Sequence, residues 1–132
     1  MPVSAYSGTD GLPLKPVEWI GRARDDLRAL PRAVRREMGY ALWLAQLGEY
    51  APQSKRMKGE LSGLIEIVED HDGNAYRAVY AARLRGVIYV LHVFQKKSTR
   101  GIATPRRILD LIRQRYARAR EHHARHYGQG DL

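Results

Sequence analysis

Apolar positions in the first half of the chain recur at helical spacing. Ala23, Leu27 and Leu30 predict a short amphipathic helix, and residues 16–20 before it predict a short strand. A second helix is expected from Pro31, whose missing N–H does no harm in a first helical turn, to a cap at Gly48. The apolar stripe of this helix consists of Val34, Met38, Ala41, Leu42 and Ala45.

After Pro52 the spacing of apolar positions changes from helical to alternating. Residues 64–69 alternate, residues 71–74 read His-Asp-Gly-Asn, which is a hairpin turn signal, and residues 76–82 predict the next strand. Residues 87–94 are almost continuously apolar, as expected of a strand covered on both faces. We therefore expect an antiparallel meander of three strands, with one of the last two in the central position.

A long C-terminal helix completes the pattern, with Thr104 as its expected N-cap and Pro105 at its first helical position. The sequence thus predicts an α+β fold: an N-terminal strand, a helical hairpin, an antiparallel three-strand meander and a C-terminal helix, with the helices on one face of the sheet. We expect a flexible arm over 1–14, a single domain over 15–127 and a frayed tail over 128–132, with fraying beginning near His122.

Composition adds a strong positive charge to this picture. The chain has 132 residues, a formal net charge of +9 and no cysteine. The charge favours a polyanionic partner, and the missing cysteine excludes disulfides, a thiolate nucleophile and a Cys-bearing zinc site. No stretch is apolar enough to span a bilayer, and no export signal opens the chain, so we expect a cytoplasmic protein without a membrane partner.

Basic side chains flank the predicted meander and should converge when it forms. Lys55, Arg56 and Lys58 precede it, Arg77 lies within it, and a basic loop with Lys96, Lys97 and Arg100 follows it. Because hairpin pairing brings strand ends together, these cations could hold a phosphodiester and stabilise the extra charge of its transition state. The alternative is a solvated basic rim.

Arg77 is the most informative of these residues because it interrupts a strand, between Tyr76 and Tyr80. A buried unpaired charge is unfavourable, so Arg77 should either pair with a carboxylate or point into a polar cleft. Glu66 on the preceding strand is the expected partner. The pair could be structural, or it could place Glu66 as a general base beside a bound phosphate. Tyr80 could be a core aromatic or could stack on a base.

The histidines offer weaker signals. His92 lies in an apolar strand, where a histidine is more often a core residue than a catalyst. His122 and His126 have the i, i+4 spacing of metal ligands, and His123 lies between them. No acidic or cysteine partner accompanies them, so we predict no metal site.

Several short blocks in a fixed order carry a family resemblance. They include Tyr76-Arg-Ala-Val-Tyr80, then Phe94-Gln-Lys-Lys-Ser98, and Thr104-Pro105 opening the last helix, preceded by Trp19-Ile-Gly21 and Asp26-Leu-Arg-Ala-Leu-Pro31. Over residues 15 to 120, the chain resembles the phage-derived HigB-like branch of the RelE/ParE toxin superfamily.

The resemblance implies the toxin of a type II toxin–antitoxin pair with a compact α+β fold. Relatives are endoribonucleases that need no metal or other cofactor. They cut mRNA in the ribosomal decoding site by attack of a ribose 2′-hydroxyl on its own 3′-phosphate. A cognate antitoxin encoded beside the toxin neutralises it. A small helix-turn-helix protein encoded nearby would favour such a pair here.

The resemblance also assigns roles to individual residues. Arg77 matches the strand arginine that grips the scissile phosphate, and Lys97, together with Lys96, falls where relatives carry a group serving the leaving oxygen. Lys58 matches a basic residue entering the sheet. The strand lysines that some relatives use as base are missing here. Other relatives use a glutamate as base, so the resemblance implies Glu66 as a substitute.

Two other function classes remain open from the sequence. One is a non-enzymatic inhibitory toxin, as in the branch of the superfamily that poisons DNA gyrase. The other is a nucleic-acid-binding regulator without toxic action.

Overall fold

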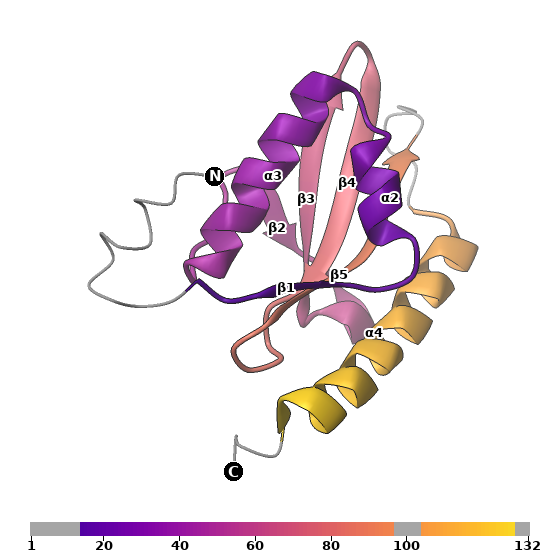
Figure 1. Cartoon of the computed structure of the whole chain (residues 1–132). Helices are drawn as coiled ribbons and strands as arrows, with labels where there is room; N and C mark the ends of the chain where they lie inside the picture. The colour runs from indigo at the N-terminus through magenta and orange to yellow at the C-terminus, as the bar shows by residue number, and fades with distance from the viewer. Residues whose placement is uncertain (1–13, 97–103, 129–132) are drawn as a thin grey trace.

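The structure is a computed structural model that describes residues 14–96 and 104–128. In these residues it contains one five-stranded sheet with helices on both faces (Figure 1). The strand order is β1-β5-β4-β3-β2. β1 runs parallel to β5, and the other neighbouring strands are antiparallel. The elements are β1 (Val17–Trp19), α2 (Ala23–Arg28), α3 (Arg32–Gln46), β2 (Ser54–Arg56), the 3₁₀ turn η1 (Gly59–Leu61), β3 (Leu64–His71), β4 (Asn74–Ala81), β5 (Ile88–Lys96) and α4 (Arg106–His126).

The predicted α+β class and the meander β3-β4-β5 are confirmed, with β4 in the middle. The β3–β4 turn has Asp72 at φ +50° and Gly73 at φ +79°. Positive φ at both central residues is typical of a two-residue type I′ hairpin, which is why Asp-Gly serves there. The edge strand β2 was not predicted, because three residues are too few to show alternation.

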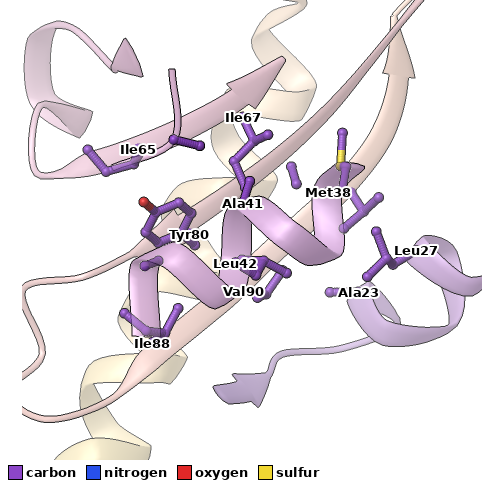
Figure 2. Packing of buried hydrophobic residues seen from close by; sticks show 14 of the residues in the cluster. Ala23, Leu27, Met38, Ala41, Leu42, Ile65, Ile67, Tyr80, Ile88 and Val90 are labelled. Carbon is purple, nitrogen blue, oxygen red and sulfur yellow. The ribbon is translucent and has the colours of Figure 1, made fainter. Parts of the chain in front are cut away.

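The prediction that the helices cover one sheet face is wrong. α2 and α3 pack on one face over a cluster that includes Ile88 and Val90 of β5 (Figure 2). α4 packs on the other face, where its Ile112 joins Tyr89 and Leu91 in a second cluster. Because successive side chains of β5 point to opposite faces, its continuous apolar run requires a cover on each side.

Both ends of α4 differ from the predictions. The N-cap is Pro105 rather than Thr104. The helix continues past His122 to His126, because His123 is buried and its Nε2 lies 2.8 Å from the carbonyl oxygen of Arg85. Fraying from His122 is therefore wrong. The predicted arm and tail lie, except for Leu14 and Gly128, outside the described residues. None of the described helices is both long and apolar enough to cross a membrane.

Candidate functional site

A cleft of about 690 Å³ opens between the sheet, η1 and the first turns of α4. Its basic residues outnumber its acidic ones by six to two. Six of the nine site residues predicted from the sequence line it, because β2, β3, β4 and β5 meet at this end of the α4 face. The lining consists of Lys55, Arg56, Met57, Lys58, Gly59, Glu60, Leu61, Glu66, Arg77, Lys96, Thr104, Leu109 and Arg113.

Strand register places the central carboxylate between two cations. Lys55 of β2 lies directly opposite Glu66 of β3, and Arg77 of β4 lies one diagonal step away, opposite Val68. Glu66 is buried, with 5% of its surface exposed. Its Oε1 accepts a hydrogen bond from Arg77 Nη1 at 2.9 Å and lies 3.8 Å from Lys55 Nζ. The predicted Arg77–Glu66 pairing is therefore confirmed.

Arg77 also faces the cleft, so the two possibilities for this residue hold together. Its side chain is 15% exposed and forms part of the cleft wall. Its Nε is buried and has no hydrogen-bond partner within residues 14–96 and 104–128. A guanidinium carries five N–H donors, and the bond to Glu66 uses one of them. Arg77 therefore keeps the donor capacity to hold an oxyanion.

Lys96, the last residue of β5, is a cleft cation whose pKa is lowered by its surroundings. Burial lowers the pKa of its ammonium group, and the nearby charges of Arg77 and Lys55 lower it further, while Glu66 partly opposes them. The ammonium group of Lys96 forms no hydrogen bond or ion pair with another described residue. A lysine with a lowered pKa gives up its proton more readily than an ordinary lysine, which suits a proton donor.

One cation of the cleft, Arg113, is already hydrogen-bonded to two carboxylates. Arg113 of α4 donates from Nη1 to Asp110 at 2.6 Å and from Nη2 to Glu60 of η1. These two hydrogen bonds raise the pKa of its guanidinium. The sequence did not predict this contact, because no local pattern links Arg113 to Glu60, 53 residues away. Arg113 therefore ties α4 to η1 across the cleft.

Comparison with known proteins identifies the family of the chain. Residues 25–117 match the family model described as "Phage derived protein Gp49-like (DUF891)". The chain belongs to this Gp49-like family. No curated protein matches significantly. Among solved structures, a chain of the toxin–antitoxin complex RelBE2 from Mycobacterium tuberculosis is similar, with a TM-score of 0.45 and 22% identity over 64% of this chain and 100% of that chain.

Tyr80 of the Gp49-like chain does not line the cleft, so its assignment as a core aromatic is confirmed and its assignment as an RNA-binding residue is wrong. It is 1% exposed and lies among the core residues on the α3 face, near Ile65 (Figure 2). Burial raises the pKa of its phenol to about 12. Alternation along β4 directs Arg77 to one face and Tyr80, three residues later, to the other. The remaining two predicted residues, Lys97 and Arg100, lie outside the described residues.

The histidines also lie away from the cleft lining. His92 stacks on Phe94, and its Nδ1 lies 3.1 Å from Nη1 of Arg115. Burial, followed by the charge of Arg115, lowers the pKa of His92. His122 Nδ1 pairs with the Tyr89 hydroxyl at 2.8 Å. Across the described parts of the chain, no group of three or more histidine and acidic side chains could hold a metal ion.

Proposed function

We propose that this Gp49-like chain is the toxin of a type II toxin–antitoxin pair, of the HigB-like kind, that cleaves mRNA on the ribosome in the cytoplasm without a metal cofactor. The observation that carries the proposal is the arrangement of Arg77, held by Glu66, beside Lys96 in a cleft with excess positive charge. Phosphodiester cleavage by an internal nucleophile needs positioning, charge stabilisation and proton transfer. This arrangement can position the phosphate, stabilise its charge and supply a proton to the leaving oxygen.

In the proposed reaction the ribose 2′-hydroxyl attacks the adjacent phosphorus and the bond to the 5′-oxygen breaks. The products are a 2′,3′-cyclic phosphate and a 5′-hydroxyl. Arg77 holds the non-bridging oxygens and stabilises the charge of the pentavalent transition state. Lys96 donates a proton to the leaving 5′-oxygen, and Lys97 stays a candidate for the same step. Lys58 and Arg56 bind flanking phosphates.

Glu66 has a positioning role in this proposal rather than that of general base. Its Oε1 already accepts a hydrogen bond from Arg77 and faces Lys55. Two cations on one oxygen hold the carboxylate in a fixed position between β2 and β4. Glu66 instead holds the guanidinium of Arg77 in the orientation that presents its other donors to the cleft. The proton of the 2′-hydroxyl passes to a solvent water molecule in this proposal.

The proposed partner is an antitoxin that carries an acidic segment. The side chains of Arg56, Lys58 and Lys96 form no hydrogen bond or ion pair with the rest of the described chain, and all three residues line the cleft. Unpaired cations attract an anionic peptide as well as RNA. An acidic segment lying across them would block the cleft and neutralise the toxin.

The decisive experiment adds the purified protein to ribosomes translating a defined mRNA and maps new RNA ends. We expect 5′-hydroxyl ends inside codons, and about a hundredfold fewer of them with Arg77→Ala. A parallel assay measures supercoiling by DNA gyrase. Inhibition of gyrase without new mRNA ends would replace this proposal by the non-enzymatic one. Binding of nucleic acid without either effect would indicate a regulator.

A further inference from the structure

A second, smaller pocket lies next to the cleft and contains an exposed aromatic ring. Tyr50 follows α3 and precedes β2, and 57% of its surface is exposed. The pocket has a volume of about 120 Å³ and is lined by Tyr50, Ser54, Lys55, Arg56 and Ile65. We call it the Tyr50 pocket.

The edge strand β2 separates the Tyr50 pocket from the cleft. Arg56 lies opposite Ile65, whose side chain belongs to the α3-side core, whereas Lys55 lies opposite Glu66 of the cleft. Alternation along the strand thus directs neighbouring residues to its two faces. Lys55 and Arg56 nevertheless line both pockets. The two pockets are therefore joined around the edge of the sheet by two cationic side chains.

We propose that the Tyr50 pocket binds one nucleobase of a single-stranded RNA by stacking on the Tyr50 ring, while a phosphate of the same strand lies against Lys55 and Arg56. The inference rests on the proposed function for the choice of RNA as ligand. Single-stranded nucleic acids are bound by aromatic rings on which bases stack, next to cations that follow the backbone.

Three features of the pocket favour a base. Tyr50 presents its ring to solvent, where an apolar surface of this size gains from being covered. Ile65 supplies an apolar wall beside it. The guanidinium of Arg56 makes no hydrogen bond or ion pair elsewhere in the described residues, so its charge is available to a phosphate. Ser54 directs its hydroxyl to the carbonyl of Ala51 at 2.6 Å. Because this hydroxyl is already used, the pocket should recognise a base mainly by stacking, which every base can make, rather than by hydrogen bonds.

Tyr40 provides a matched control. It is exposed to a similar extent, 54%, but lies on α3 and packs on Trp43, with ring centroids 5.6 Å apart. It lines neither the cleft nor the Tyr50 pocket. If the exposed tyrosines served a protein partner, both would be expected to contribute. If Tyr50 binds RNA in the pocket, only Tyr50 should contribute to RNA affinity.

The test uses a fluorescent RNA hexamer with 2′-O-methyl groups throughout, which cannot be cleaved, and a series in which one base at a time is removed. Fluorescence anisotropy at low salt gives the affinities. We expect Tyr50→Ala to weaken binding of the complete hexamer about tenfold, whereas Tyr50→Phe and Tyr40→Ala bind like the parent. When the base that stacks on Tyr50 is the one removed, the parent and Tyr50→Ala should bind the hexamer with equal affinity.

The inference would be overturned if the parent did not bind the hexamer, or if Tyr50→Ala bound it as tightly as the parent. It would also be overturned if Tyr40→Ala lost as much affinity as Tyr50→Ala, or if the ratio of parent to Tyr50→Ala affinity were the same with every abasic hexamer. Weaker neutralisation by the antitoxin for both tyrosine variants, with RNA affinity intact, would assign the surface to protein. Because the hexamer cannot react, absence of mRNA cleavage by the parent would refute the proposed reaction and leave this result standing. Cleavage with an unaffected Tyr50→Ala would refute the pocket alone.

Discussion

Arg77 Nη1 and Glu66 Oε1 lie 2.9 Å apart across two neighbouring strands, within the sheet rather than at its rim. The side chains are 15% and 6% exposed, so both charges have lost most of their water. A buried ion pair of this kind contributes little net stability, because desolvation offsets the attraction, but loss of one partner is unfavourable. The pair therefore fixes the orientation of Arg77 more than it stabilises the fold.

Arg77→Ala should reduce cleavage by about a hundredfold or more, because the phosphate loses its main anchor. It should also lower the free energy of unfolding by about 3 kcal/mol, since Glu66 is left buried beside Lys55 alone. Arg77→Lys should be impaired too, because a lysine cannot hold two oxygens with a planar fork. Cleavage on ribosomes and urea unfolding measure the two effects.

The double variant Glu66→Leu/Arg77→Met is the control that separates stability from chemistry. Replacing both charges by apolar side chains removes the unpaired carboxylate, so the double variant should recover stability relative to Arg77→Ala. Its cleavage should stay at the level of Arg77→Ala. Recovery of cleavage together with stability would show that Arg77 acts only through the fold.

Lys96 should produce an alkaline limb in the pH profile of cleavage. The pKa of Lys96 is lowered by burial and by Arg77, so its proton is lost at a lower pH than that of an ordinary lysine. Activity that needs the protonated form is full below this pKa and falls as pH rises through it. Lys96→Met should remove the limb and slow cleavage by about 10²-fold. A limb that persists in Lys96→Met would assign the proton transfer to another group.

The same substitution should not destabilise the protein. Because the pKa of Lys96 is lower in the folded chain, the unfolded chain binds more protons, and the contribution of Lys96 to stability improves as pH rises. Lys96→Met should therefore unfold at the same or a higher urea concentration than the parent at neutral pH. Lys58→Met serves as the control for loss of one cleft cation, and should keep the alkaline limb.

Tyr80 should matter to stability and not to RNA. Tyr80→Phe keeps the buried ring and should cleave mRNA like the parent. Tyr80→Ala should lower the free energy of unfolding by about 3 to 5 kcal/mol, because it leaves a cavity in the α3-side core. Thermal unfolding and cleavage assays on both variants check this. Slow cleavage by a stable Tyr80→Phe variant would contradict the position of Tyr80 behind the sheet.

The end of α4 should behave as part of the domain. His123→Ala removes a buried side chain and its hydrogen bond to the carbonyl oxygen of Arg85, and should lower the free energy of unfolding by about 2 kcal/mol. His126→Ala, three residues later and exposed, should change stability by less than about 0.5 kcal/mol. Equal stability of the two variants in urea would indicate that the last turn of α4 is frayed.

Expression of the chain alone should arrest growth, and co-expression of a cognate antitoxin should restore it. The basis is the proposed cleavage of mRNA and the unpaired cations that line the cleft. Arg77→Ala should allow growth while still binding the antitoxin in a pull-down assay. Normal growth of several hosts with verified strong expression of the parent would contradict the toxin assignment.

The amino-acid sequence by itself determined the elements with a regular pattern. Apolar periodicity located α2, α3, the meander and α4, and Asp72-Gly73 located the β3–β4 turn, since only a few residue types accept positive φ. The position of Arg77 within a strand indicated Glu66 as its partner, because a charge inside a sheet requires a counter-charge. These are local rules, and they depend on neighbouring residues.

Only the tertiary structure decided which side chains share a face and which meet across the sheet. The placement of α4 opposite α3 put Tyr80 in the core and opened the cleft on the side of Arg77. The contact between Glu60 and Arg113, and the pairing of Lys55 with Glu66, join segments that no sequence pattern links. Such contacts depend on how whole elements pack, because burial of apolar area is non-directional and leaves the cover of each sheet face to the geometry of the complete chain.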